Sequence, residues 1–112
     1  GVMSDSQPTP AQVAAAGLDD WRQVEGALLA RFHTRDFATG LEFVNRIGAV
    51  AEALQHHPDL TLTYPEVTVS LSSHDVGGVT DRDLALAREI TAIAAALGVP
   101  SMKPEADGTT GG

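Results

Sequence analysis

Hydrophobic and polar positions alternate along the chain with two different periods, and the first clear pattern has the period of a strand. Over residues 21–37, apolar and polar side chains alternate on either side of a break at residues 25–27. This pattern is typical of two β-strands joined by a turn. The inward-facing positions are Leu28, Ala30 and Phe32, and the outward-facing positions include Arg31 and His33.

Residues 36–55 change to the helical period, in which apolar side chains recur three or four positions apart. Asp36 is placed to cap the start of this helix. Pro58 restricts the residue before it, so the helix is expected to end near Gln55 or His56. The residues expected to form its buried stripe are Phe37, Leu41, Val44, Ile47, Ala51 and Leu54.

Alternation returns after Pro58 and predicts a second pair of strands. The third strand is expected near residues 60–64. Pro65 cannot donate a ladder hydrogen bond, so it marks the turn to the fourth strand. In that strand one face holds Val67, Val69 and Leu71, and the other holds Thr68, Ser70, Ser72 and, by parity, His74. Residues 75–78 predict a loop.

Two further segments predict helices. Residues 9–17 form a short one, in which Thr9 is the expected cap. Thr80 caps a longer helix near the end of the chain, and acidic residues in its first turn suit the helix dipole. Gly98 ends that helix. Its expected buried stripe is Leu86, Ile90, Ile93 and Leu97.

The predicted order of elements is α-β-β-α-β-β-α, which favours the α+β class. We expect a four-stranded antiparallel sheet with helices packed on one face. The other face meets either water or another subunit. Residues 9–100 are expected to form a single domain, between a disordered leader at 1–8 and a disordered tail at 101–112.

The composition narrows the range of functions. The net charge is −8 at pH 7, which repels nucleic-acid phosphates and disfavours a membrane surface. There is no cysteine, so disulfides and thiolate metal sites are excluded. No apolar run has the length of a membrane span. These features favour a cytoplasmic protein that binds a small molecule or another protein.

Histidines are the main candidates for chemistry. The chain has four, of which His56 and His57 are adjacent at the end of a helix and His74 follows a strand. Histidine exchanges protons near neutral pH. Solvated surface histidines and a three-histidine zinc site are the alternatives, but no helix-spaced ligand pair is present. A serine hydrolase using Ser72 or Ser73 is a weaker alternative because the GxSxG motif is absent.

The spacing of these residues resembles a known family. The pattern Glu52-x3-His56-His57-Pro58-x5-Tyr64-x9-His74-x8-Asp83 is similar to the signature of the pterin-4a-carbinolamine dehydratases. The resemblance extends over about residues 18–98. It implies a four-stranded antiparallel sheet with helices on one side, and assembly into a homodimer or homotetramer.

The implied reaction is loss of water from a 4a-hydroxytetrahydropterin, giving the quinonoid dihydropterin in the recycling of a pterin cofactor. The pterin is the substrate, and no metal or separate cofactor is implied. By resemblance, the catalytic residues are His56, His57 and His74. Within this set His56 and His74 are the acid–base candidates, and His57 contacts the substrate. The other residues expected to bind substrate or support the histidines are Glu52, Pro58, Ser72, Ser73 and Asp83.

The chain departs from the family pattern at two places. Leu60 stands where members often have an aromatic residue, and Pro65-Glu66 follows Tyr64 where members often have Asn-Lys. Leu60 removes a surface on which the pterin ring could stack. Some relatives of this family act as dimerisation cofactors of a transcription factor, so a non-catalytic pterin-binding or coactivator module is the alternative function.

Overall fold

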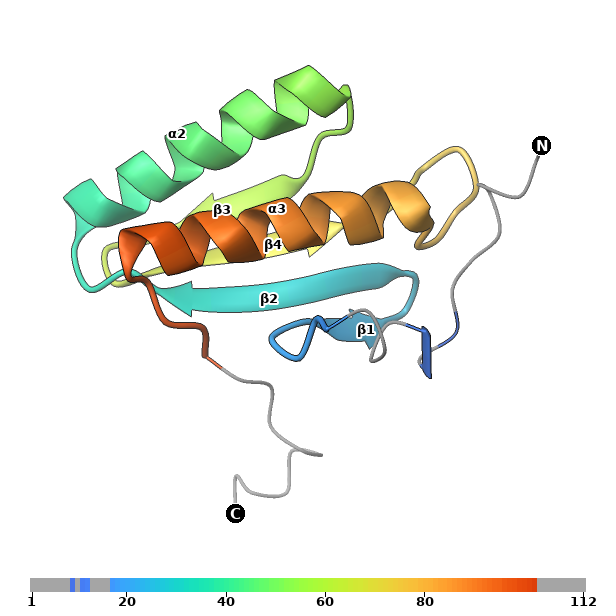
Figure 1. The fold of residues 1–112 in the computed structure, drawn as a ribbon, viewed down its shortest axis with the longest axis horizontal. Coiled ribbons are helices and arrows are strands. Elements are labelled where there is room, and N and C mark those ends of the chain that lie inside the picture. The colour runs from blue at the N-terminus through green and yellow to red at the C-terminus, as the bar shows by residue number, and fades with distance from the viewer. Residues whose placement is uncertain (1–8, 10, 13–16, 103–112) are drawn as a thin grey trace, which may run out of the picture.

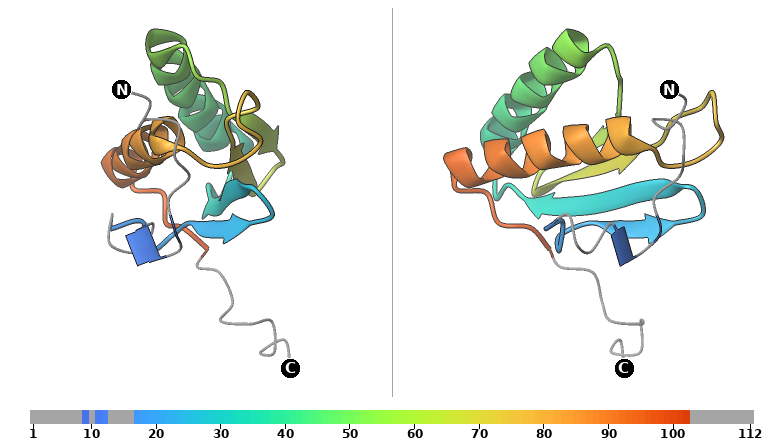
Figure 2. Two further views of the ribbon diagram at one scale, coloured as in Figure 1. Left: turned by 90° about the vertical axis from the view of Figure 1, so that its right-hand side faces the viewer. Right: turned by 45° about the vertical axis from the view of Figure 1, so that its right-hand side comes forward.

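The computed structural model describes residues 9, 11–12 and 17–102, and in them a four-stranded antiparallel sheet carries two long helices. The strands lie in the order β1-β2-β4-β3. Both helices cover the same face of the sheet (Figures 1 and 2). The predicted α+β class is therefore confirmed. The elements are β1 (Arg22–Val24), β2 (Ala27–His33), α2 (Phe37–Leu54), β3 (Asp59–Leu62), β4 (Glu66–Leu71) and α3 (Asp81–Leu97).

The first hairpin forms where the alternation predicted it. β1 and β2 pair through a two-residue turn at Glu25 and Gly26, whose φ angles are 46° and 84°. Two positive φ values are the signature of the type I′ turn, whose twist matches that of the flanking strands. Gly26 takes this conformation at no steric cost, so the turn sets the register of the hairpin.

The central strands β2 and β4 supply the sheet side of the core. Their inward-facing side chains are all at most 3% exposed: Leu28, Ala30, Phe32, Val67, Val69 and Leu71. Arg31 and His33 are exposed on the opposite face. Arg31 donates two hydrogen bonds to the Glu66 carboxylate, both 3.0 Å long. The predicted division of the sheet into a buried and an open face is therefore confirmed.

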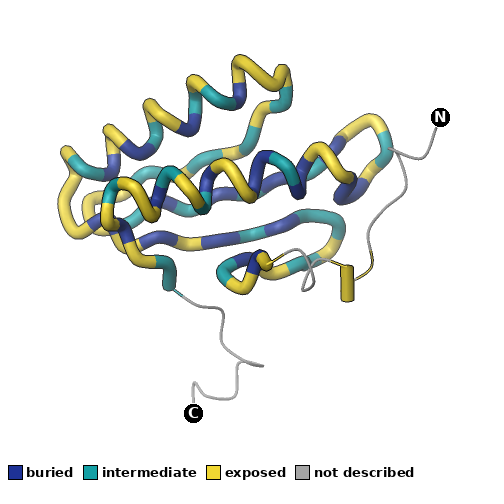
Figure 3. Tube along the Cα trace, viewed as in Figure 1, coloured by how far each residue is buried: buried dark blue, intermediate teal, exposed yellow. Residues whose placement is uncertain are grey.

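The predicted buried stripe of α2 is partly wrong. The helix buries Gly40, Phe43, Ile47 and Ala51, whereas Phe37, Leu41 and Leu54 are 48%, 45% and 47% exposed. Figure 3 shows exposed positions along the outer side of this helix.

The reason is that α2 carries two adjacent apolar stripes, and local periodicity cannot tell which of them faces the sheet. Gly40 helps to decide, because a Cβ there would lie 2.7 Å from Leu62 Cδ1 and 3.2 Å from Thr34 Oγ1. The glycine therefore lets the helix approach β3 on the side of Phe43.

α3 begins and ends as predicted. Thr80 and Asp83 form a reciprocal capping box at its start, and Gly98 ends it with φ 69°. Leu86 and Ile90 are fully buried. Ile93 and Leu97, the other two predicted members of the stripe, are partly buried against the core. Within the described part of the chain, neither helix has the length and apolar character needed to cross a membrane.

The C-terminal boundary of the domain extends beyond the predicted one. Ser101 forms a bridge with Phe32, and the Met102 N–H donates to the Arg31 carbonyl at 2.7 Å. The predicted disordered tail at 101–112 is therefore wrong for Ser101 and Met102, because they pair with the backbone of β2. Residues 103–112, like the predicted leader 1–8, lie outside the described residues.

Only part of the predicted N-terminal helix is described. Residues 11–12 are helical. The Gln12 N–H donates to Thr9 Oγ1, and the Thr9 N–H donates to Gln12 Oε1. This reciprocal pair agrees with Thr9 as the cap. The remainder, apart from Gly17, lies outside the described residues.

Candidate active site

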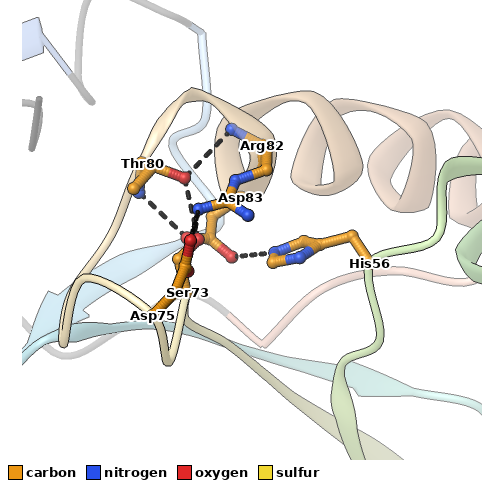
Figure 4. Close-up of polar contacts among 6 residues, drawn as sticks. All are labelled: His56, Ser73, Asp75, Thr80, Arg82 and Asp83. Atoms are coloured by element: carbon orange, nitrogen blue, oxygen red, sulfur yellow. Dashed lines mark hydrogen bonds and ion pairs between the residues drawn. The ribbon is translucent and has the colours of Figure 1, made fainter. Parts of the chain in front are cut away.

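Three segments that are distant in the sequence meet at one end of the sheet. β3 and β4 are antiparallel, and Asp59 near the start of one pairs with Ser70 near the end of the other. The residues just before β3 and just after β4 therefore lie at the same end. The first turn of α3 joins them there, and Figure 4 shows His56, Ser73 and Asp83 directed toward one another.

His56 comes just after Gln55, the residue that caps the end of α2. Gln55 takes a left-handed conformation with φ 54°, and the His56 N–H donates to the Ala51 carbonyl at 3.1 Å. The helix thus ends where Pro58 predicted it. The chain reversal turns the His56 ring inward, and its side chain is only 12% exposed.

A short polar contact joins the mostly buried His56 ring to Asp83. The distance from His56 Nε2 to Asp83 Oδ1 is 2.5 Å, and the Asp83 side chain is fully buried. A buried carboxylate is costly unless its oxygens are hydrogen-bonded. This contact meets that requirement for one oxygen and holds the imidazole in place.

The second oxygen of Asp83 is also satisfied. Ser73 Oγ and the Thr80 N–H both donate to Asp83 Oδ2, each at 2.9 Å. Both groups donate to this oxygen, so Asp83 acts here as an acceptor. The proton between His56 and Asp83 is therefore assigned to His56 Nε2. That leaves His56 Nδ1 as the ring nitrogen that can exchange a proton with a bound molecule.

His57 lies in a more open environment than its neighbour. Its Nε2 is 2.6 Å from Glu52 Oε2, and the two side chains are 57% and 73% exposed. The sequence predicted that Glu52 would bond an imidazole. The partner is His57, because the reversal at Gln55 buries His56 away from the outer surface of α2. Pro58, half-buried, separates this pair from β3.

His74 lies in the turn that follows β4. The strand ends at Leu71, so the alternation used to assign His74 to the open face of the sheet does not extend to it. The Ser73 N–H donates to the Gly78 carbonyl at 2.7 Å, which closes the turn around exposed His74. Because Ser73 bonds Asp83, this turn is anchored next to the His56–Asp83 pair. Ser72, which comes just before Ser73, is half-buried.

An ion pair ties this turn to α3. Arg82 donates to both oxygens of Asp75 at 2.9 and 3.0 Å. The hydrogen bond from Arg82 lowers the pKa of Asp75, and the charge of His56 contributes to the same shift. This interaction between Asp75 and His56 indicates that the turn lies close to the His56–Asp83 pair.

The lowered pKa predicts how acid affects stability. Asp75 has a lower pKa when folded than its unfolded value of about 3.9. The contribution of Asp75 to the free energy of unfolding is therefore present above about pH 4 and is lost as the pH falls through the pKa of the folded state. Urea unfolding from pH 7 to pH 3 should show falling stability, with a shallower fall in Asp75→Asn. Identical pH dependence in the two proteins would contradict this assignment.

Two parts of the site were not predicted from sequence. They are the hydrogen bond that the Thr80 N–H donates to Asp83 and the burial of Ser73 against the same carboxylate. Asp83 therefore caps α3 and also bonds His56. The spacing of Thr80 and Asp83 signals a capping box, but no local pattern shows that Asp83 also meets His56. Within residues 17–102, no three His, Asp or Glu side chains gather closely enough to hold a metal ion.

The fold and the site together define an α+β protein with a buried histidine–carboxylate pair at one end of an antiparallel sheet. A family model described as pterin 4 alpha carbinolamine dehydratase matches residues 5–93. The chain therefore belongs to the pterin-4a-carbinolamine dehydratase family.

Individual relatives agree with this membership. A Metallosphaera sedula protein named "Putative pterin-4-alpha-carbinolamine dehydratase" is 46% identical over 77 residues, covering 69% of this chain and 80% of the relative. A Thermosynechococcus vestitus protein with the same name is 43% identical over 88 residues, covering 77% and 93%.

Solved structures share the fold. A transcriptional coactivator/pterin dehydratase from Brucella melitensis superposes with a TM-score of 0.74 at 34% identity, covering 80% of this chain and 99% of that one. A pterin dehydratase-like protein identified as a RuBisCO assembly factor in the alpha-carboxysome has a TM-score of 0.58 at 22% identity, covering 67% and 89%. The second likeness concerns the fold alone.

Proposed function

We propose that this protein is a 4a-hydroxytetrahydropterin dehydratase that works by histidine acid–base catalysis. The observation that supports this most directly is the His56–Asp83 pair, in which a buried carboxylate holds an imidazole at the end of the sheet. The family membership supplies the substrate class. A pterin cofactor-recycling role in the cytoplasm follows as part of the same proposal.

The reaction needs two proton transfers. The bond from C4a to the hydroxyl oxygen breaks as a general acid protonates that oxygen, and water leaves. The proton on N5 goes to a base or to solvent as the double bond between N5 and C4a forms. One histidine that gives a proton and one that accepts a proton balance this reaction without a metal or a redox partner.

The residues divide between these roles by burial. His56, held by Asp83 through Nε2, presents Nδ1 to the substrate as one acid–base group. His74, exposed in the turn anchored by Ser73, is the second, on the opposite face of the pterin. His57 and Glu52 lie in the open and contact the polar part of the substrate. Pro58 and Ser72 line the same end of the sheet.

The proposal is tested by generating 4a-hydroxytetrahydropterin in situ and following its dehydration by ultraviolet absorbance. The wild-type protein should accelerate the reaction, and His74→Ala should lower kcat by about 10²–10⁴-fold. An acceleration no greater than that of a buffer control would overturn the proposal. Stoichiometric zinc in the active purified protein, found by elemental analysis, would instead support the metal-site alternative.

His57→Ala should affect binding more than turnover. The His57–Glu52 pair is exposed, so its hydrogen bonds to a substrate are present in the ground state and the transition state alike. Loss of such uniform binding raises KM while kcat changes little. Steady-state kinetics should show a KM increase of about tenfold, and a kcat loss as large as that of His74→Ala would contradict the binding role.

A coactivator-type binding module is the second candidate function. It is favoured by the Brucella melitensis structure, which is described as a transcriptional coactivator as well as a pterin dehydratase. The two candidates are separated by the absorbance assay together with pterin binding measured by calorimetry. Binding without turnover would favour the module.

We also propose that the protein forms a homodimer or homotetramer, in part through α2. Phe37 and Leu41 lie one helical turn apart and are 48% and 45% exposed. Burying such side chains between subunits removes apolar surface from water. Sedimentation velocity should show an oligomer for wild type and a shift toward monomer for Phe37→Ser combined with Leu41→Ser. A monomeric wild-type protein at micromolar concentration would contradict the proposal.

A further inference from the structure

Ser73 is a buried serine beside the His56–Asp83 pair. Its hydroxyl bonds other residues of the protein, whereas a substrate-binding group would be open to a ligand. The residue is 1% exposed. Its oxygen is 2.9 Å from Asp83 Oδ2 and 2.8 Å from Thr80 Oγ1. Both contacts are internal, so the hydroxyl is occupied within the protein rather than directed toward a ligand.

The number of available protons determines the direction of each hydrogen bond. Ser73 has one hydroxyl proton, and it goes to Asp83 because an ionised carboxylate has none to give. In the contact between Ser73 and Thr80, the donor must then be the Thr80 hydroxyl. The oxygen of Thr80 in turn accepts from the Arg82 N–H at 3.2 Å.

A single ordered chain of hydrogen bonds results. From donor to acceptor it runs from the Arg82 N–H through the hydroxyls of Thr80 and Ser73 to Asp83 Oδ2, and His56 Nε2 donates to the other oxygen of Asp83 (Figure 4). Hydrogen bonds in such a chain polarise one another in a low-dielectric interior. Without Ser73, Asp83 Oδ2 would keep only the Thr80 N–H, and the carboxylate would be held less firmly in its orientation toward His56.

We propose that Ser73 is a positioning residue that holds the Asp83 carboxylate in the orientation that keeps the proton of His56 on Nε2. It also anchors the turn that carries His74, so one buried hydroxyl aligns both catalytic histidines. The kinetic part of this inference rests on the proposed dehydratase activity. The hydrogen-bonding part does not depend on that activity.

The test uses Ser73→Ala, which removes the hydroxyl at nearly constant volume. We expect kcat to fall roughly 10- to 100-fold with KM within about twofold, because a small displacement of a catalytic group is costly. We also expect wild type to show a low-field proton NMR signal from the His56 ring N–H, because this group is bonded to buried Asp83, and we expect Ser73→Ala to lose that signal. Assignment of this signal comes from its absence in His56→Gln.

Two variants serve as controls. Ser73→Thr keeps a hydroxyl and should restore both the protected signal and most of kcat. Ser101→Ala removes a comparable bond, from Ser101 Oγ to Asp20 Oδ1 at 2.7 Å, and should change neither. If Ser73→Ala does not fold, Ser73→Cys keeps the volume with a weak S–H donor and should show the same losses.

The outcomes separate the two claims. Wild-type kcat and a protected His56 signal in Ser73→Ala, or in Ser73→Cys if that variant is needed, would overturn the positioning role. If the wild-type protein has no dehydratase activity but its protected signal depends on Ser73, the positioning network stands and the proposed function fails.

Discussion

Replacing His56 by alanine is expected to lower kcat for 4a-hydroxytetrahydropterin dehydration by about 10²–10⁴-fold, the usual contribution of one proton-transfer group. His56 is bonded to the buried carboxylate of Asp83, whereas adjacent His57 is bonded to the exposed carboxylate of Glu52, so His57 is not placed to take over the role of His56. The absorbance assay measures the loss directly. KM should change less, because the missing group acts mainly in the transition state.

The variant needs two controls. Alanine leaves Asp83 Oδ1 without its donor, at a cost of about 1–3 kcal/mol in stability, so folding must be verified by urea unfolding before kcat is compared. His33→Ala removes an exposed histidine on the open face of the sheet and should keep wild-type activity. Full turnover by folded His56→Ala would remove His56 from the mechanism.

Replacing Phe43 by alanine is expected to lower the free energy of unfolding by about 3–5 kcal/mol. Phe43 is fully buried, and its ring lies 5.0 Å from that of Phe32 in an edge-to-face arrangement. Truncation removes this aromatic contact and leaves a cavity between α2 and the sheet. A domain of this size has about 5–15 kcal/mol of stability, so the loss is a large share of the total.

Phe37→Ala is the matched control, because it makes the same change on the same helix at a residue that is 48% exposed. It should cost about 1 kcal/mol or less within one subunit. Any further loss through subunit contacts should depend on protein concentration. Chemical unfolding at several concentrations separates these contributions, and a larger intrinsic loss for Phe37→Ala than for Phe43→Ala would contradict the observed packing of α2.

The strands were more predictable than the packing of the helices. A strand has only two faces, so the alternation at Leu28 and Val67 was enough to assign every inward position of β2 and β4. A helix can rotate continuously about its axis. The choice between Phe37 and Phe43 therefore depended on the contact of Gly40 with Leu62, which comes from a strand later in the chain.

The candidate site divides in the same way. The histidines, Asp83 and the element ends that carry them were named from spacing and from resemblance. Which carboxylate bonds which histidine was not predictable, because Glu52 precedes both His56 and His57 closely enough to bond either. The left-handed turn at Gln55 decides the matter by burying one ring and exposing the other.

The order of residues alone was sufficient for the α+β class, the paired strands, the helix caps and the family. These features depend on interactions within a few positions of the chain or on residues at set spacings. Only folding could bring His56, Ser73 and Asp83 together and give each polar atom its partner. Those contacts join segments up to 27 residues apart, and their geometry depends on how the helices settle on the sheet.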